Sequence, residues 1–241
     1  MKDTLPRWQL AQNYEKNWWS DRKDEIDLTY LKNYADELIH ETKDYITITG
    51  STGILEIGSG PAGIITFLPS NNRHAIDPLE DYFSSVDSYA SFRDKNVQYR
   101  KAKGEDLPYA DHNFDFIIMD NVLDHCDDPG KVILEMHRVL KPGGIVYFRQ
   151  NTYHIWGKFI RELFETIRID KGHPHTFLKS YLERRFSQLG FTTEKRSSRG
   201  YYKTWKSELL SPRKVDKLKA FLFATRDKTL YILKKQNTPS R

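Results

Sequence analysis

A glycine-rich segment restricts the fold of this chain more than any other feature of its sequence. Residues 54–63 read ILEIGSGPAG, with Gly58, Gly60 and Gly63 in G-x-G-x-x-G spacing. Gly58 permits a tight turn, Gly60 lets the backbone approach a ligand, and Gly63 lets a helix pack closely on a sheet. Because the glycines follow a predicted strand and precede a predicted helix, they indicate a ligand-binding turn of an α/β fold.

Short apolar runs alternate with helical patterns through the first 150 residues. The expected strands are residues 53–59, 73–77, 97–101, 114–120 and 144–150. The expected helices are residues 8–19, 26–47 and 129–140, the last of them stopped by KPGG. This alternation predicts an α/β, doubly wound, Rossmann-like sheet that is mostly parallel, and such sheets bind ligands at the carboxyl ends of their strands.

The later part of the chain is less regular. Residues 155–169 and 176–189 have helical patterns, and residues 191–198 and 229–235 are expected to form a final antiparallel pair of strands. The basic stretch 200–228 gives no clear pattern: its mixture of lysine, arginine and aromatic residues suits either RNA binding or a solvated amphipathic face.

Composition restricts the class of protein only broadly. The chain has 241 residues, a formal charge of +5, a pI of about 9.0 and a single cysteine, Cys126. The mild basic excess raises the odds of an anionic partner without establishing one. One cysteine allows no disulfide within the chain, MKDTLPRWQL lacks the apolar core of a secretory signal, and no run approaches the roughly 18 apolar residues of a membrane span. We therefore expect a cytoplasmic protein with no membrane span, and Cys126 as a small buried residue.

Glu56 distinguishes between two classes of ligand for the glycine turn. A dinucleotide places an anionic pyrophosphate at the helix N-terminus, and a carboxylate two residues before Gly58 would repel it. S-adenosylmethionine carries an ammonium and a sulfonium group and no phosphate. A buried carboxylate is costly unless paired, so a cationic ligand, acting directly or through neighbouring backbone amides, would justify Glu56. Asp77, at the end of the second predicted strand, is placed to accept hydrogen bonds from two ribose hydroxyls.

Four segments together resemble the class I S-adenosylmethionine-dependent methyltransferases, in particular their small-molecule group. These segments are ILEIGSGPAG, HAIDP, AKGEDLPYADHNFDFIIMDNVLDHCDDP and RVLKPGG, within residues 50–150. The resemblance implies a seven-stranded sheet with an antiparallel last strand, and S-adenosyl-L-methionine as cofactor, with S-adenosyl-L-homocysteine as product. We expect an N-terminal helical cap over residues 1–48 and a methyltransferase unit over 49–241, with an insert around 151–190.

The resemblance also implies roles for individual residues at the cofactor. Those expected at the methionine moiety are Glu56, Gly58, Ser59 and Gly60, with Tyr14 and Trp18 reaching it from the N-terminal helix. Asp77 would hold the ribose, beside Pro78 and Leu79 at the adenine. Glu105 or Asp106 would accept a hydrogen bond from the exocyclic amine of the adenine. The residues GED depart from the usual order in this family, which is an acid followed by a small residue. Asp120 and Asn121, at the end of the fourth strand, would lie near the methyl group.

Histidines are the candidates for acid–base chemistry. His125 falls one helical turn after Asn121, and the resemblance places it near the sulfonium. His173 and His175 flank a proline in KGHPHTF, which resembles an acceptor-site segment of methyltransferases linked to cell-surface sugar biosynthesis. We therefore predict that His125, His173 and His175 line the reaction chamber. Since no third ligand is fixed by spacing, we expect no metal.

Three functions remain open at this stage. The first is methylation, most readily at oxygen, of a small-molecule or carbohydrate-like acceptor by direct in-line transfer. The second is methylation of RNA or protein with help from the basic C-terminal region, so a nucleic-acid partner stays possible but less favoured. The third is a non-catalytic cofactor-binding subunit. The sequence does not indicate the oligomeric state.

Overall fold

The computed structural model describes residues 6–23, 25–166 and 174–237. A mixed sheet runs through the molecule in the order β3-β2-β1-β4-β5-β8-β7. Its strands are β1 (Gly53–Ile57), β2 (Asn72–Asp77), β3 (Val97–Lys101), β4 (Phe114–Asp120), β5 (Leu140–Tyr153), β7 (Phe191–Arg199) and β8 (Asp227–Lys235), and the short β6 (Phe177–Leu178) pairs with the end of β5.

The pairing confirms the predicted Rossmann-like sheet. Strands β1 to β5 pair in parallel, and β8 runs antiparallel to both β5 and β7. The antiparallel final pair predicted for 191–198 and 229–235 is therefore confirmed. The order reverses between β1 and β4, so the ends of these two strands form the place where doubly wound sheets bind ligands.

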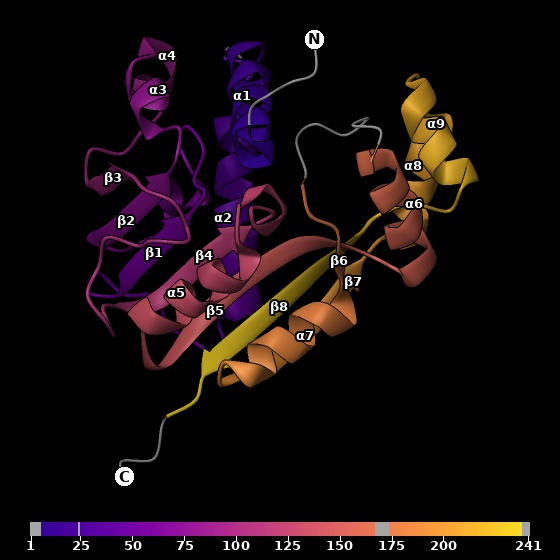
Figure 1. Cartoon of the computed structure of the whole chain (residues 1–241). Helices are drawn as coiled ribbons and strands as arrows, with labels where there is room; N and C mark the ends of the chain where they lie inside the picture. The colour runs from indigo at the N-terminus through magenta and orange to yellow at the C-terminus, as the bar shows by residue number, and fades with distance from the viewer. Residues whose placement is uncertain (1–5, 24, 167–173, 238–241) are drawn as a thin grey trace.

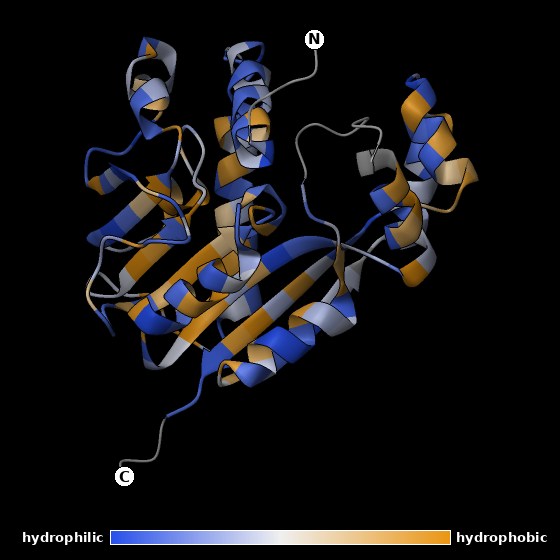
Figure 2. Ribbon diagram, in the orientation of Figure 1, coloured by the Kyte–Doolittle hydropathy of each residue, from blue (hydrophilic) through white to orange (hydrophobic). Residues whose placement is uncertain are grey.

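Helices cover both faces of the sheet. Helices α5 (Pro129–Val139) and α7 (Lys179–Gln188) pack on one face through Val132, Met136, Leu182 and Phe186. Helix α2 (Leu28–Thr42) packs on the other through Tyr34 and Leu38. Figure 2 shows apolar residues concentrated in the central strands, as expected for parallel strands buried on both faces.

The remaining helices gather at the carboxyl ends of the parallel strands. They are α1 (Arg7–Ser20), α3 (Glu80–Ser84) and α4 (Asp87–Ser91) toward the β1–β3 side, and α6 (Ile155–Thr166), α8 (Tyr201–Leu210) and α9 (Lys214–Phe221) toward the β7–β8 side (Figure 1). The basic stretch 200–228, which had no clear pattern, thus forms the helix pair α8–α9 and the start of β8. This helix pair adds a wall to the ligand end of the sheet.

Two local expectations were wrong. The turn after Gly63 leads into a single 3-10 helix, η1 (Ile64–Phe67), in place of the helix expected after the glycines. The helix expected from residue 176 begins later, because residues 177–178 first pair with β5 as β6. Helix α7 has no side-chain cap.

Candidate active site

A cleft of about 860 Å³ opens where β1 and β4 end. Its walls come from α1, the glycine turn, the ends of β2 and β4, the 3-10 helix η2 (Leu123–His125) and the α8–α9 pair. This volume lies toward the upper end of the roughly 300–1,000 Å³ of typical ligand sites, which leaves room for more than one small molecule.

Glu56 lies on the face of β1 that packs against η1, with 4% of its surface exposed. Its carboxylate oxygens accept hydrogen bonds from the backbone N–H groups of Ile64 at 3.2 Å and Ile65 at 2.9 Å. Burial raises the pKa of Glu56 to about 8, although these two backbone bonds act to lower it. The side chain of Glu56 therefore accepts from two backbone amides and fixes the shape of the glycine turn.

Gly63 is required by this arrangement. Its φ of +77° lies in the left-handed region, and a Cβ there would overlap Glu56 Oε2. Gly60, with φ +59°, is covered by the indole of Trp19, whose nearest atom would lie 3.3 Å from an added Cβ. Both glycines therefore allow close approach of side chains that build the cleft.

Asp77 ends β2 and faces the glycine turn. Its Oδ2 accepts from the backbone N–H of Gly60 at 3.0 Å and its Oδ1 from that of Leu79 at 2.8 Å. Burial raises its pKa to about 6, and the nearby acids Glu15 and Glu80 add to the rise. An ionised carboxylate can accept about four hydrogen bonds, so Asp77 keeps acceptor capacity for a ligand hydroxyl.

The segment after β3 presents one of its two acids to the cleft. Glu105 lines it and accepts hydrogen bonds from the backbone N–H groups of Asp127 at 2.7 Å and Asp128 at 3.2 Å. Asp106 is exposed and does not line the cleft, because the turn that bonds its N–H to Lys103 directs it outward. Of the two acids predicted at the adenine, the structure therefore brings Glu105 to the cleft and not Asp106. Pro78 and Leu79 line the same end of the cleft.

The end of β4 is held by an ion pair that sequence reasoning did not identify. Asp120 accepts from Arg149 Nε at 2.5 Å and Nη2 at 2.7 Å, and the guanidinium lies 4.4 Å from the ring centre of Tyr34. Asn121 has φ +55° and its Oδ1 accepts from the backbone N–H of Asn151. Such a left-handed, non-glycine residue at a strand end is typical of functional sites, and both Asp120 and Asn121 line the cleft.

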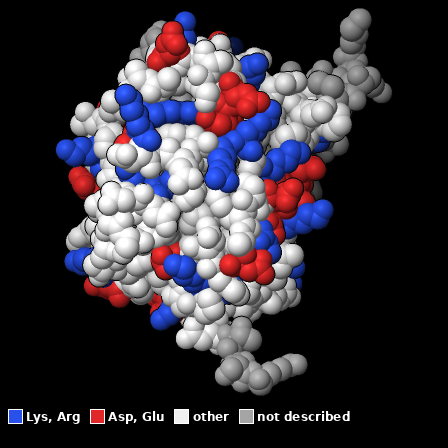
Figure 3. Space-filling model, turned by 90° about the vertical axis from the view of Figure 1, so that its left-hand side faces the viewer, with Lys and Arg blue, Asp and Glu red and all other residues white. Residues whose placement is uncertain are grey.

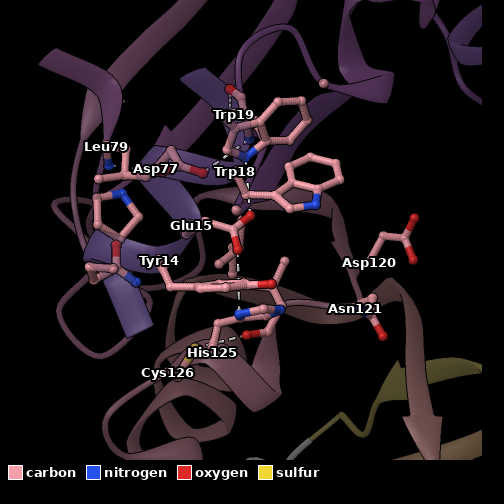
Figure 4. A pocket seen from close by; sticks show the side chains of 18 of the residues that line it. Tyr14, Glu15, Trp18, Trp19, Asp77, Leu79, Asp120, Asn121, His125 and Cys126 are labelled. Atoms are coloured by element: carbon pink, nitrogen blue, oxygen red, sulfur yellow. Dashed lines mark hydrogen bonds and ion pairs between the residues drawn. The ribbon is translucent and has the colours of Figure 1, made fainter. Parts of the chain in front are cut away.

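His125 closes η2 and lies under the N-terminal helix. Its Nδ1 is 3.8 Å from Glu15 Oε2, and its Nε2 is 3.9 Å from Asp124 Oδ1. Glu15 also accepts a hydrogen bond from Trp19 Nε1 at 3.0 Å, so it lies between Trp19 and His125 (Figure 4). Cys126, next in the chain, is 7% exposed, and burial raises the pKa of its thiol well above the usual range.

Helix α1 forms one wall of the cleft. Tyr14 and Trp18, both expected at the cofactor, line it together with Glu15 and Trp19, which were not expected (Figure 4). The helix is fastened by Trp19, whose backbone carbonyl accepts from Tyr89 Oη at 2.6 Å and whose ring meets Phe83 edge-on at 6.0 Å. The glycine turn and helix α1 are thus held together by Trp19.

Of the two later histidines, the structure describes only His175, and it does not join His125. His173 lies outside the described residues. His175 lines a separate pocket with Phe177 and Lys158, and its Nε2 is 3.0 Å from the backbone oxygen of Cys126. It therefore packs behind η2 and does not line the cleft, because β6 pairing with β5 draws this segment to the back of η2.

The far wall of the cleft was not foreseen. Its lining residues are Arg161, Thr204, Ser207, Glu208, Ser211, Arg213, Val215, Asp216, Lys219 and Arg226. A signal was present in the sequence, since Thr204, Ser207, Glu208 and Ser211 recur at i, i+3, i+4 and i+7, which places them on one helix face.

Within residues 6–23, 25–166 and 174–237, no cluster brings three or more His, Cys, Asp or Glu residues together as metal ligands. Within the same ranges no helix has the length and apolar character needed to cross a membrane.

Residues 55–148 match the family model described as Methyltransferase domain. The human thiol S-methyltransferase TMT1B is 29% identical over 137 residues, covering 54% of this chain and 56% of that protein. The chain spans about half the length of the curated relatives it matches.

Solved structures agree on the fold. The YcgJ protein from Bacillus subtilis superposes with a TM-score of 0.61 at 16% identity, covering 86% of this chain and 100% of that one. Geranyl diphosphate C-methyltransferase from Streptomyces coelicolor A3(2), solved with S-adenosyl-L-homocysteine, superposes with a TM-score of 0.64 at 12% identity, covering 83% and 79%. Residues 55–148 therefore resemble a methyltransferase domain, and the chain shares its fold with a solved S-adenosyl-L-homocysteine-bound methyltransferase.

Proposed function

We propose that the chain binds S-adenosyl-L-methionine at the glycine turn and transfers its methyl group to a small acceptor. One observation carries the proposal: the lining residues from α1 to η2 include the acids Glu15, Glu56, Asp77, Glu105 and Asp120. Among the described lining residues of that half, none is lysine or arginine. A cationic sulfonium and ammonium suit such a site, and the diphosphate of a dinucleotide does not. We call it the acidic half of the cleft.

The residues of this half fit the cofactor. Asp77 keeps free acceptor positions for the ribose hydroxyls, and Glu105 lies at the end of the cleft beside Pro78 and Leu79, where the adenine would bind. Glu56 holds the start of η1 and so the shape of the turn. Trp18 and Trp19 cover the turn from α1, which would exclude water from the bound cofactor.

In the proposed reaction the protein chiefly positions the reactants. The cofactor supplies an activated methyl group when bound. Holding an acceptor in line with it can contribute about 7–11 kcal/mol. His125 is our candidate for the base that takes the acceptor proton, since it lies in the cleft with Glu15 beside its Nδ1. A base of this kind serves a hydroxyl acceptor, our first proposal, and equally a thiol, the acceptor class named for the human relative.

A polynucleotide acceptor is less well supported. On the face shown in Figure 3, basic and acidic side chains are interspersed and form no broad basic track. Many basic side chains pair with acids, as Arg138 does with Asp111 and Glu135, and Arg93 with Glu80. Nucleic-acid binding depends on uncompensated cations along a phosphate path, and the face in Figure 3, on the β1–β3 side, presents no such broad path.

The cofactor proposal is tested by calorimetry with S-adenosyl-L-homocysteine and with NAD, on the wild type and on Asp77→Asn and Asp106→Asn. Asp77→Asn removes a charged acceptor and should weaken S-adenosyl-L-homocysteine binding about tenfold or more. Asp106→Asn is the matched control, because Asp106 is exposed outside the cleft, and it should bind like the wild type. Binding of NAD with no response to S-adenosyl-L-homocysteine would refute the proposal.

A further inference from the structure

The cleft changes its charge from one end to the other. Beyond the acidic half, its wall contains the cations Arg161, Arg213, Lys219 and Arg226. We propose that these four residues, here called the basic half, bind a phosphate or carboxylate group of the methyl acceptor. This inference rests on the proposed function, since it names the class of acceptor that the same cleft would take. Opposite charges at the two ends would draw a cationic cofactor and an anionic acceptor to separate places.

The acids of the basic half are already engaged by its own helices. Glu208 accepts from Thr225 Oγ1 at 2.6 Å, and Asp216 accepts from Ser211 Oγ at 2.9 Å. Asp216 also forms ion pairs with Arg213 Nε at 3.8 Å and with Lys219 Nζ at 3.7 Å, both longer than the 2.7–3.2 Å of an ordinary hydrogen bond. The two acids therefore compensate the cations only in part.

Two arginines remain available to a ligand. The side chain of Arg213 is 73% exposed, and its pairing with Asp216 leaves the donors of its guanidinium fork open. In the part of the chain that the structure describes, the exposed Arg226 guanidinium makes no ion pair or hydrogen bond. A guanidinium presents paired donors that match the oxygens of phosphate and carboxylate, so arginines suit this role better than lysines.

Arg161 adds a cation deeper in the cleft. It is 7% exposed, and its guanidinium carbon lies 5.2 Å from the ring centre of Tyr153. An anionic group entering from the α8–α9 side would therefore meet Arg213 and Arg226 at the surface and Arg161 within.

The elements that present these cations are fastened to one another. Trp156 Nε1 of α6 donates to the carbonyl of Leu222 at 2.9 Å, and Trp205 Nε1 of α8 donates to that of Ala220 at 2.9 Å. His154 Nε2 lies 2.7 Å from the carbonyl of Phe223. The three helices thus form one platform at the carboxyl end of the sheet (Figure 1), which holds the cations in a fixed arrangement.

The test measures binding of inorganic pyrophosphate and of succinate to protein saturated with S-adenosyl-L-homocysteine, by calorimetry. At least one of the two anions should bind, and the double variant Arg213→Gln/Arg226→Gln should weaken that binding about tenfold or more. Both arginines are exposed, so the variant is expected to fold. Lys217→Gln is the matched control: Lys217 is an exposed cation on α9 that does not line the cleft, and its loss should change little.

Three results would overturn the inference. The first is absence of anion binding while S-adenosyl-L-homocysteine still binds, which leaves the proposed function intact. The second is an equal loss in the control, which would indicate general attraction by the net charge. The third is far tighter binding of single-stranded RNA that the double variant abolishes, because that would assign the basic half to a polynucleotide. Failure to bind S-adenosyl-L-homocysteine at all would refute the proposed function and the inference together.

Discussion

Gly63 and Glu56 depend on each other across the glycine turn. The carboxylate of Glu56 reaches the amides of Ile64 and Ile65 only because Gly63 has no side chain in its path. The φ of Gly63 would strain any other residue as well. The glycine spacing read from the sequence therefore has two causes here, one in the backbone and one in the space that a buried carboxylate occupies.

Gly63→Ala should lower the free energy of unfolding by about 3 kcal/mol or more, since backbone strain adds to the loss of the Glu56 hydrogen bonds. Gly190→Ala is the matched control: Gly190 also has positive φ, +81°, but its nearest atom would lie 3.6 Å from an added Cβ. It should lose only about 1–2 kcal/mol. Equal losses in urea unfolding would show that Glu56 plays no part.

His125 is the residue on which the proposed chemistry depends. Once an acceptor is in hand, His125→Gln should lower turnover about 10²–10⁴-fold and leave the affinity for S-adenosyl-L-homocysteine nearly unchanged, because it removes a base from the acceptor side of the cofactor. His40→Gln, at an exposed position on α2, is the control. A variant with normal turnover and a normal pH profile would remove His125 from the mechanism.

Helix α1 illustrates how one element joins binding and chemistry. Trp19 covers Gly60, and Glu15, one turn earlier, lies beside both Trp19 and His125. Docking of α1 therefore completes the cofactor wall and orients the candidate base at the same time. The α8–α9 pair acts at the other end, where it supplies the polar and basic wall that the acceptor would meet.

Trp19→Ala should detach α1 from the glycine turn, because the contacts of its ring with Phe83 and with the backbone at Gly60 are lost together. We expect about tenfold or greater loss of S-adenosyl-L-homocysteine affinity, and faster amide hydrogen exchange over residues 7–20. Trp156→Ala, at a tryptophan outside the cleft, should leave both measurements unchanged. Wild-type affinity in Trp19→Ala would separate α1 from cofactor binding.

Burying acids in the acidic half lowers the stability of the folded protein at higher pH when no cationic ligand is bound. The pKa of Glu56 rises from 4.5 to about 8 on folding, so the folded protein holds a proton that the unfolded chain releases. Stability from this group is complete below pH 4.5 and is lost as the pH rises through 8. Burial lowers the pKa of His137 from 6.5 to about 4, which acts in the opposite direction, but only below pH 6.5.

The melting temperature of the unliganded protein should therefore fall between pH 6.5 and 8, with a slope of up to about 1.4 kcal/mol per pH unit in stability. Glu56→Gln should flatten this slope even if it lowers the stability throughout. S-adenosyl-L-methionine should stabilise the wild type more at pH 8 than at pH 6.5, because its charge favours the ionised acid. Parallel melting curves for variant and wild type would contradict this account.

Local sequence patterns were enough to predict the sheet and the glycine turn of the protein. The strands, the order of the glycines, the acid at the end of β2 and the antiparallel final pair follow from spacings within short segments, because such spacings set backbone geometry and burial directly. The cofactor class followed from a single charge, Glu56, at a turn that would otherwise suit a phosphate. Predicting these features requires no knowledge of which distant segments contact each other.

Tertiary packing alone decided the rest of the site. Glu15 meets His125, Arg149 pairs with Asp120, and His175 lies against the backbone of Cys126, each across a long separation in the chain. An amphipathic pattern predicts which face of a helix is polar, but it does not predict which cleft that face lines. The α8–α9 wall therefore could not be predicted from the basic stretch 200–228. Glu105 and Asp106 show the same limit. They are adjacent in the sequence, but only Glu105 lines the cleft, because the turn directs Asp106 outward.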